Sequence, residues 1–104
     1  MDKPINIKVR YLLHLYTFVG NRREEEITIE ETSPTIRSVI DKLIKNYGEE
    51  FKKMIMDPKT NDIRYYPSIE EKQKAHRVLL NGVNIQLLKG INTELKDGDI
   101  LSIY

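Results

Sequence analysis

Two turn signals with short apolar runs around them mark the last third of the sequence, and this pattern constrains the fold more than any other stretch. An Asn-Gly pair at 81–82 lies between two apolar runs. Asn-Gly tolerates positive φ at both positions, which a tight hairpin turn requires. An Asp-Gly pair at 97–98 is a second turn signal, followed by apolar residues. We therefore expect a hairpin at 78–88 and a final strand at 100–104.

Residues 5–15 alternate between apolar and polar side chains, which predicts a strand with one face on the core. Leu12 is an apolar residue on the otherwise polar parity. A Gly-Asn turn at 20–21 precedes residues 26–30, whose two isoleucines alternate with polar residues and predict a second strand. The two strands should form a hairpin. Its core-facing residues are Ile7, Val9, Tyr11, Leu13, Ile27 and Ile29.

A helix start follows the first hairpin. Thr32 or Ser33 can cap the helix, and Pro34 suits the first helical position, where its missing N–H is not needed. Gly48 is the expected stop. Between them, apolar residues recur at helical spacing and predict one stripe that packs on the sheet. The stripe is Ile36, Val39, Ile40, Leu43, Ile44 and Tyr47.

The middle of the chain carries weaker signals. Residues 49–56 favour a short second helix with Phe51, Met54 and Ile55 on one side. Residues 57–61 have turn chemistry, and residues 63–66 favour a short strand. The polar stretch 68–74 is either a surface loop or a partner-specific insertion, and we favour the loop.

The last third completes the expected order of elements. Residues 76–80 enter the second hairpin, and residues 85–88 are its expected return strand. Residues 91–95 should form a turn or 3₁₀ segment, with Leu95 closing the end of the core. The order is hairpin, helix, irregular link, hairpin and final strand. It predicts a single α+β domain over residues 1–104, with helices on one face of a small sheet.

Composition excludes several classes of protein. A formal net charge of +1 and a pI of about 7.9 argue against a dedicated nucleic-acid binder. The charged run at 22–26 could be a binding patch, but we favour a solvated loop or strand edge. No apolar run approaches the roughly 20 residues of a membrane span, and the first residues lack the apolar core of a signal peptide. We therefore expect no membrane or nucleic-acid partner and a cytoplasmic location.

The sequence contains no recognisable catalytic or metal-binding constellation. There is no cysteine, and His14 and His76, the two histidines, lie far apart without partners at ligand spacing. The glycines are isolated at turns, so no phosphate-binding loop is built. The carboxylate pairs at 30–31 and 49–50 flank the helix, where acidic residues are routine. We predict that this chain is not an enzyme and needs no metal or cofactor.

The order of elements and several motifs together resemble the MoaD/ThiS family of ubiquitin-like sulfur carriers. The resemblance begins with the strand at 7–12, closed by Val-Gly at 19–20, and continues with Ser-Pro-Thr-Ile at 33–36. It is sharpest at 78–85 and at 90–103, where Leu-Lys-Asp-Gly-Asp precedes the terminal strand. The resemblance implies a β-grasp fold: a mixed sheet of four or five strands on one main helix, with the first and last strands parallel.

The resemblance also implies a function. Family members end in a flexible Gly-Gly tail, whose carboxylate an ATP-dependent activating enzyme adenylates before sulfur transfer makes a thiocarboxylate. In the molybdopterin branch the tail enters the large subunit of molybdopterin synthase, and the sulfur becomes part of the molybdenum or tungsten cofactor. In the thiamine branch the sulfur enters the thiazole. Glycine is required because the tail threads a narrow channel in any backbone conformation.

This sequence departs from the family pattern where it stops, at Tyr104, without Gly-Gly. Either the chain was shortened or it has lost carrier chemistry, and we favour a carrier of the molybdopterin-synthase small-subunit type. A ubiquitin-like protein modifier, which would form isopeptide bonds, is an alternative. A tailless β-grasp interaction module is another, since one fold serves many functions. No catalytic residue is expected in any of the three.

The predicted site is a partner-binding patch. If the first and last strands are neighbours, as the resemblance implies, Leu12 and Tyr104 form an apolar centre on the solvent face of the sheet. Arg10 and Ser102 contribute its polar rim. An apolar centre with a polar rim is typical of protein-binding surfaces, although single exposed apolar residues are also common. The expected partners are the large subunit of molybdopterin synthase and the activating enzyme.

Overall fold

The structure is a computed structural model that describes residues 3–12, 15–63 and 77–104. Its strands form a five-stranded sheet in the order β2-β1-β7-β5-β6 and a separate two-stranded sheet of β3 and β4. The strands are β1 (Ile5–Tyr11), β2 (Glu24–Ile29), β3 (Met56–Asp57), β4 (Asp62–Ile63), β5 (Val78–Leu80), β6 (Val83–Asn84) and β7 (Ile100–Ile103). The helices are α1 (Ile36–Tyr47) and α2 (Glu49–Ile55), with 3₁₀ turns η1 (Leu15–Phe18), η3 (Ile85–Leu87) and η4 (Gly90–Asn92).

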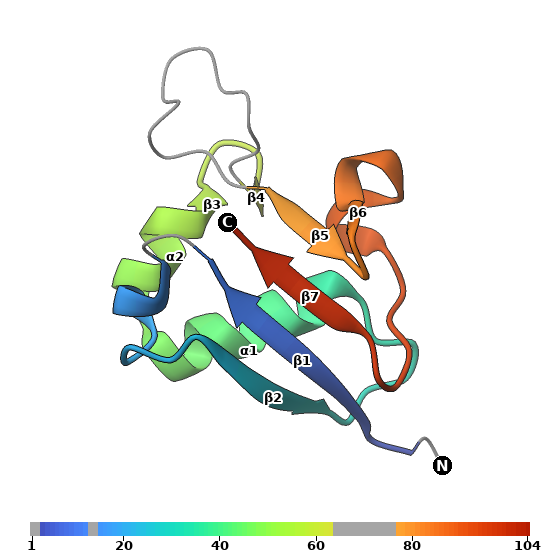
Figure 1. Cartoon of the computed structure of the whole chain (residues 1–104). Helices are drawn as coiled ribbons and strands as arrows, with labels where there is room; N and C mark the ends of the chain where they lie inside the picture. Colours follow the sequence, from blue (N-terminus) through green and yellow to red (C-terminus); the bar gives the residue numbers. More distant parts are fainter. Residues whose placement is uncertain (1–2, 13–14, 64–76) are drawn as a thin grey trace.

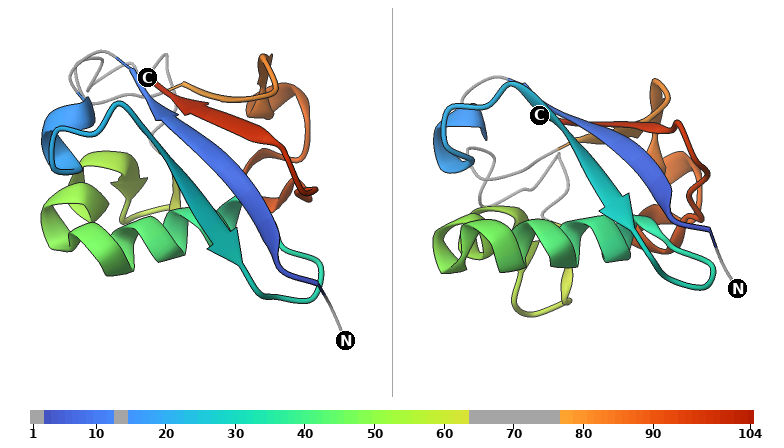
Figure 2. Two further views of the ribbon diagram at one scale, coloured as in Figure 1. Left: turned by 60° about the horizontal axis from the view of Figure 1, so that its bottom comes forward. Right: turned by 90° about the horizontal axis from the view of Figure 1, so that it is seen from below.

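Strands β1 and β7 lie side by side and run parallel (Figure 1). Their register pairs Lys8 with Ile100 and Tyr11 with Ile103. Strand β2 pairs with β1 and strand β5 with β7, both antiparallel, so the sheet is mixed. Helix α1 lies across one face of this sheet, and the opposite face carries neither α1 nor α2 (Figure 2). The predicted α+β architecture and the parallel pair implied by the resemblance are thus confirmed.

The core lies between α1 and the sheet. The alternation predicted for the first two strands is confirmed, because Ile7, Val9 and Tyr11 are buried. In β7, Leu101 and Ile103 are fully buried, because alternate side chains of the strand face the core. The helical stripe is confirmed as well, with Ile44 and Tyr47 half-buried at its end. The other buried residues of the hairpin and helix are Ile27, Ile29, Ile36, Val39, Ile40 and Leu43.

The first strand ends earlier than predicted. Strand β1 stops at Tyr11, whereas the alternation suggested a strand to residue 15. The N–H of Leu12 donates to the carbonyl of Ile103 at 2.8 Å, and the N–H of Leu15 turns back to the carbonyl of Leu12 at 3.3 Å. The turn η1 then occupies 15–18. Leu13 and His14 lie outside the described residues.

The start of α1 was predicted wrongly at the cap. Thr35, not Thr32 or Ser33, is the N-cap, and Pro34 lies before the helix. Ser33 has a φ of 51°, a turn conformation. The N–H of Thr35 donates to the Ser38 side chain at 3.1 Å, half of a capping box. The predicted stop is right: Gly48, with a φ of 86°, separates α1 from α2.

The second hairpin has the predicted turn but a shorter return strand. Asn81 and Gly82 have φ values of 51° and 87°, as an Asn-Gly turn requires. The return strand is β6 alone, and the predicted strand at 85–88 is wrong. The Asn84 side chain accepts a hydrogen bond from the N–H of Gln86 at 2.9 Å, which starts the turn η3 instead. The turn predicted at 91–95 is confirmed in part by η4, and Leu95 is buried.

The link after α2 forms a small hairpin of β3 and β4 that the sequence did not predict as such. Its turn lies at 57–61, where turn chemistry was expected. The N–H of Asn61 donates to the carbonyl of Asp57 at 2.8 Å, and the φ of Asn61 is 55°. Of the strand predicted at 63–66, only Ile63 is described, and it belongs to β4. The loop predicted at 68–74 and His76 lie outside the described residues.

The two stretches that carry the sharpest family motifs meet in space at the start of β7. The N–H of Asn81 donates to the carbonyl of Ile100 at 2.8 Å, and the N–H of Ile100 donates to the Asn81 side-chain oxygen at 2.9 Å. The Asn81 amide also donates to the Asp99 carboxylate at 3.0 Å. We call Asn81, Asp99 and Ile100 the turn junction. It joins the β5–β6 hairpin to the turn before β7.

Candidate partner-binding site

The face of the sheet opposite α1, here called the open face, carries the residues predicted to bind a partner. Its side chains include Asn6, Lys8 and Arg10 of β1, Glu24 and Thr28 of β2, Ile100 and Ser102 of β7, and Leu79 of β5. The parallel register places Arg10 beside Ser102. Leu12 lies beside the end of β7 through its hydrogen bond to the carbonyl of Ile103. Tyr104 directly follows β7 and is 36% exposed. The structure therefore brings Arg10, Leu12, Ser102 and Tyr104 together, and their role in binding stays a prediction.

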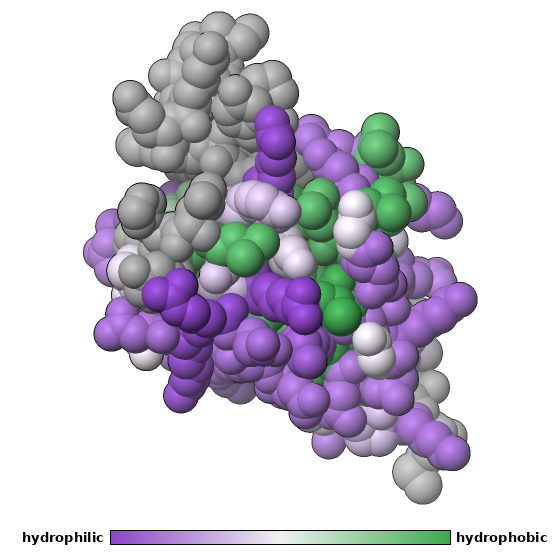
Figure 3. All heavy atoms as spheres, viewed as in Figure 1, coloured by the Kyte–Doolittle hydropathy of each residue, from purple (hydrophilic) through white to green (hydrophobic). Residues whose placement is uncertain are grey.

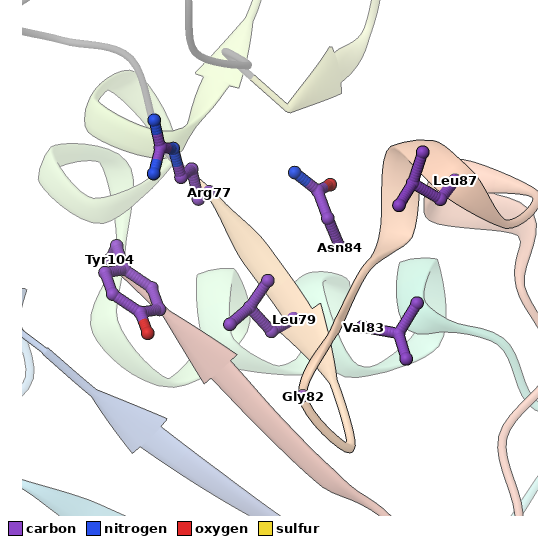
Figure 4. A pocket seen from close by; sticks show the side chains of 7 residues that line it. All are labelled: Arg77, Leu79, Gly82, Val83, Asn84, Leu87 and Tyr104. Atoms are coloured by element: carbon purple, nitrogen blue, oxygen red, sulfur yellow. The ribbon is translucent and has the colours of Figure 1, made fainter.

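A groove that the sequence did not predict extends this patch across the second hairpin. It has a volume of about 630 Å³ and is lined by Arg77, Leu79, Gly82, Val83, Asn84, Leu87 and Tyr104. We call it the hairpin groove. Figure 4 shows Arg77 and Tyr104 at one end, Leu79 in the middle, and Val83 and Leu87 at the other end. Strand β5 contributes Leu79 to the lining, and the pairing of Leu79 with Ser102 joins this strand to β7.

The hairpin groove collects most of the exposed apolar side chains in the described part of the chain. In the described part of the chain, four large apolar residues are exposed: Val83 (42%), Leu87 (80%), Leu88 (45%) and Tyr104 (36%). Three of them line the groove. Figure 3 shows hydrophobic surface gathered on the β5–β6 side of the open face. A cluster of exposed apolar side chains at one groove is typical of an interaction surface.

Sequence reasoning missed the groove because it placed residues 85–88 in a strand, where alternate apolar side chains would be buried. In the structure these residues form η3, and Leu87 projects into solvent. One signal was present. The run Val-Asn-Ile-Gln-Leu-Leu at 83–88 has two adjacent leucines, which a two-sided strand in a small sheet cannot both bury.

A polar network that sequence reasoning also missed closes one end of the β1–β2 hairpin. The Tyr11 hydroxyl donates to the Glu25 carboxylate at 2.7 Å, and the Tyr47 hydroxyl donates to the same oxygen. Arg22 donates to the Tyr47 hydroxyl at 2.7 Å and lies 3.9 Å from Glu25. Tyr47 also packs against Phe51 of α2, with ring centroids 6.1 Å apart. The network therefore ties β1, β2 and α1 together.

Burial is the largest cause that raises the pKa of the two phenols in this network. Burial and the hydrogen bond to Glu25 raise the pKa of Tyr11 far above its ordinary value. The same two causes raise the pKa of Tyr47, partly opposed by the hydrogen bond from Arg22. Both phenols are therefore neutral donors at physiological pH. We interpret the network as structural, since it sits on the core side of the sheet.

The described residues contain no cluster of metal-binding side chains. Within residues 3–12, 15–63 and 77–104, no three His, Asp or Glu side chains gather closely enough to hold a metal ion. The predicted carboxylate pairs at 30–31 and 49–50 remain apart at opposite ends of α1. None of the helices in the described part of the chain is both long and apolar enough to cross a membrane.

The fold is shared with solved structures of small proteins from archaea. The Haloferax volcanii HVO 2177 protein superposes with a TM-score of 0.75 at 20% identity, covering 99% of this chain and 85% of that chain. A candidate molybdopterin converting factor, subunit 1, from Pyrococcus furiosus superposes with a TM-score of 0.69 at 25% identity, covering 95% of this chain and 94% of that chain. Small archaeal modifier protein 1 from Methanosarcina acetivorans superposes with a TM-score of 0.64 at 22% identity, covering 98% of this chain and 93% of that chain.

Sequence comparison adds the family. No curated protein sequence matches the chain significantly. The family model described as ThiS family matches residues 9–103, from the first strand through the last. That span includes β7, the turn junction and the last three residues of β1. The chain therefore belongs to the ThiS family and has the β-grasp fold of ubiquitin-like sulfur carriers and modifiers.

Proposed function

We propose that this protein is a sulfur carrier of the molybdopterin-synthase small-subunit type, acting in the cytoplasm in molybdenum or tungsten cofactor biosynthesis. It does not catalyse the chemistry itself. An ATP-dependent activating enzyme adenylates a C-terminal carboxylate, sulfur transfer yields the thiocarboxylate, and the large subunit of molybdopterin synthase receives it. The observation that carries the proposal is the position of Tyr104, where β7 ends at the hairpin groove.

The end of β7 is held firmly against the sheet. β7 pairs with β1 on one side and β5 on the other. The pairing continues to Tyr104, whose N–H donates to the carbonyl of Arg77 at 2.9 Å. A flexible tail attached after Tyr104 would therefore begin at a fixed point beside an apolar groove. Six extended residues would reach roughly 20 Å from that point into a partner bound at the groove.

The partner surface that we propose combines the predicted patch with the hairpin groove. Leu12, Leu79 and Tyr104 provide apolar contact area, and Val83 and Leu87 extend it. Arg10 and Ser102 border this area on the β1–β7 side. Aromatic and leucine side chains around one groove supply binding energy when a partner excludes water from them. The molybdopterin assignment draws support from the 25% identical Pyrococcus furiosus protein.

A ubiquitin-like protein modifier is the second candidate function. Its support is the fold shared with small archaeal modifier protein 1. A modifier would use the same surface to bind its activating enzyme and the same terminal carboxylate to form isopeptide bonds. The two functions differ in the acceptor of the activated carboxylate, which is sulfur for a carrier and a lysine amine for a modifier.

Pyrophosphate exchange with the cognate activating enzyme tests activation. The assay compares the chain ending at Tyr104 with the same chain extended by a flexible tail ending in Gly-Gly. We expect exchange with the extended chain and none with the 104-residue chain, because a carboxylate on a paired strand residue cannot enter a distant active site. Exchange that depends on the 104-residue chain would contradict the requirement for a tail. No exchange by the extended chain would favour the tailless interaction module.

Two further measurements separate carrier from modifier. The first is intact-mass detection of the oxygen-to-sulfur exchange at the extended C-terminus, followed by molybdopterin synthesis with the large subunit. The second is a search for covalent conjugates of the tagged chain in lysate of its own source. Detection of the thiocarboxylate together with molybdopterin synthesis would support the sulfur-carrier function. Covalent conjugates in the absence of molybdopterin synthesis would favour the protein-modifier function instead.

A further inference from the structure

The pair Asn81-Gly82 is the one Asn-Gly sequence in the chain. It occupies the tight turn between β5 and β6, and both residues are exposed. The chain has six other asparagines, and each is followed by a residue with a side chain. A following glycine leaves the next main-chain nitrogen unhindered and free to approach the asparagine side chain. Asn81 is thus the position at which spontaneous chemistry of an amide is sterically easiest.

That chemistry is intramolecular deamidation. The main-chain nitrogen of Gly82 attacks Cγ of Asn81, a bond forms between them, and the bond from Cγ to Nδ2 breaks. The Gly82 N–H proton leaves with the amide nitrogen as ammonia. Water then opens the resulting succinimide ring at one of its two carbonyl carbons. The products are aspartate or isoaspartate at position 81, and no oxidant or cofactor is needed.

In the folded protein two hydrogen bonds hold the reacting side chain. Its oxygen accepts from the N–H of Ile100 at 2.9 Å, and its nitrogen donates to the Asp99 carboxylate at 3.0 Å. The main chain of Asn81 is fixed as well, because its N–H donates to the carbonyl of Ile100 at 2.8 Å. Rotation of the side chain towards the Gly82 nitrogen is opposed by these hydrogen bonds. The turn junction therefore protects the amide.

We propose that Asn81 is a deamidation site, that Asp99 holds the reaction off in the folded protein, and that the product opens the turn junction. An aspartate at position 81 has no amide to donate to Asp99 and places a second carboxylate against it. Two like charges at hydrogen-bond distance repel each other. Isoaspartate in addition lengthens the main chain by one atom in a turn with two residues at positive φ. This inference is independent of the proposed sulfur chemistry.

The rate of deamidation tests the protective role of Asp99. Peptide-resolved mass spectrometry follows position 81 at neutral pH and about 37 °C in the native protein, in urea, and in two variants. Asp99→Ala removes the partner of the Asn81 amide. Asp97→Ala is the matched control, because Asp97 lies in the same turn but accepts from the N–H of Asn6 at 2.8 Å instead.

We expect the slowest reaction in the native protein and the fastest in urea. Asp99→Ala should react roughly fivefold faster than the native protein, the factor that corresponds to losing one ordinary hydrogen bond. Asp97→Ala should stay close to the native rate. Equal acceleration by both variants, or a native rate equal to the rate in urea, would overturn the proposal.

A pair of variants tests the consequence without waiting for the reaction. Asn81→Asp should lower the melting temperature, and the loss should shrink as the pH falls and one of the two carboxylates is protonated. The double variant Asn81→Asp with Asp99→Asn reverses the pair. The amide now at position 99 can donate to the carboxylate at position 81, while its oxygen accepts from the N–H of Lys96, as the Asp99 carboxylate does at 2.8 Å. We expect the double variant to recover most of the loss. A double variant less stable than Asn81→Asp would overturn the junction as the cause.

Discussion

The open face has two halves that differ in polarity, although both are built from the outward-facing side chains of one sheet. Over β1 and β2 its side chains satisfy one another: Lys8 pairs with Glu24 at 3.5 Å, and Thr28 donates to the Asn6 side chain at 2.8 Å. Over β5, β6 and the end of β7 the face is apolar and forms the hairpin groove. Figure 3 shows this change from hydrophilic to hydrophobic surface within one face.

The difference shows where binding energy is available. Exposed ion pairs and polar pairs are already stabilised by each other and by water, so covering them gains little. Exposed apolar area gains about 25 cal/mol for each Å² removed from water. A partner that covered the whole open face would therefore draw its affinity mainly from the groove half. The charged half would contribute orientation and association rate more than affinity.

The largest expected effect is on binding and comes from Tyr104→Lys. This change places a charge at the edge of the hairpin groove, and we expect the affinity for the activating enzyme or the large subunit to fall by about 2 kcal/mol, roughly thirtyfold. Titration calorimetry on tail-extended protein measures it. Thr28→Lys is the matched control on the charged half and should bind normally. Equal losses in both variants would show that the two halves do not differ.

A second effect is on stability and comes from Tyr11→Phe. The change removes the hydroxyl that donates to Glu25 and leaves the rest of the buried ring. We expect the free energy of unfolding to fall by about 1–2 kcal/mol, measured by urea denaturation. Tyr47→Phe should lose less, because Tyr47 is half-buried and water can replace its hydroxyl. A larger loss for Tyr47→Phe would reassign the centre of the network.

The same network predicts a dependence on alkaline pH. Burial, followed by the hydrogen bond to Glu25, raises the pKa of Tyr11 in the folded state. The unfolded chain therefore loses this proton first, near pH ~10, while the folded protein keeps it. The stabilisation is fully present below about pH 10 and is lost as the pH rises above it. Urea melts from about pH 9 to 11 should show a steeper decline for the native protein than for Tyr11→Phe. Parallel declines would contradict this.

A smaller effect on binding is expected from Leu12→Lys. Leu12 is already half-buried beside β7, so it offers a partner less new contact than Tyr104 does. We expect an affinity loss of about 1 kcal/mol, roughly fivefold, with the melting temperature little changed. Calorimetry beside thermal melts decides it. An unchanged affinity would confine the partner surface to the hairpin groove.

The smallest effect is expected from Lys8→Ala on the charged half. The ion pair with Glu24 is exposed and screened by salt, so its loss should change stability by no more than about 0.5 kcal/mol. Affinity for the partner should stay within about twofold, while the association rate at low salt should change more. Stopped-flow binding at two salt concentrations measures both. A large loss of affinity would show that the charged half also supplies binding energy.

The sequence was most informative where one local rule acts alone. The stripe of α1, the alternation in β1 and β7, and the positive φ at Asn81 and Gly82 each follow from a residue type and its spacing. Arg10 and Ser102 could be grouped because the resemblance supplied the pairing of the two strands. Local rules thus described the core, and the resemblance supplied the strand pairing that groups the residues of the open face.

The missed features depend on groups that are distant in sequence or compete locally. Tyr11, Glu25 and Tyr47 meet only once the register of β1 with β2 and the end of α1 are fixed, so neither spacing nor composition shows them. The hairpin groove was missed because the apolar pattern predicts a strand at 85–88. In the structure the Asn84 side chain accepts a hydrogen bond from the N–H of Gln86, and the backbone forms η3 instead. The helix start was displaced for a similar reason, since Ser33 adopts a turn and leaves Thr35 to cap.

The parallel pairing of β1 with β7 governs when this protein can fold during its synthesis. The pairing joins Lys8 to Ile100, from opposite ends of the sequence. β7 is also the strand on which β5 pairs, so the sheet has no complete centre until residues 100–103 have left the ribosome. The pairing of β1 with β7 closes a loop of most of the chain, and pairings so distant in sequence slow folding. Until then the apolar faces of the β1–β2 hairpin and of α1 lack the rest of the sheet, and incompletely packed apolar surface of this kind is prone to aggregation.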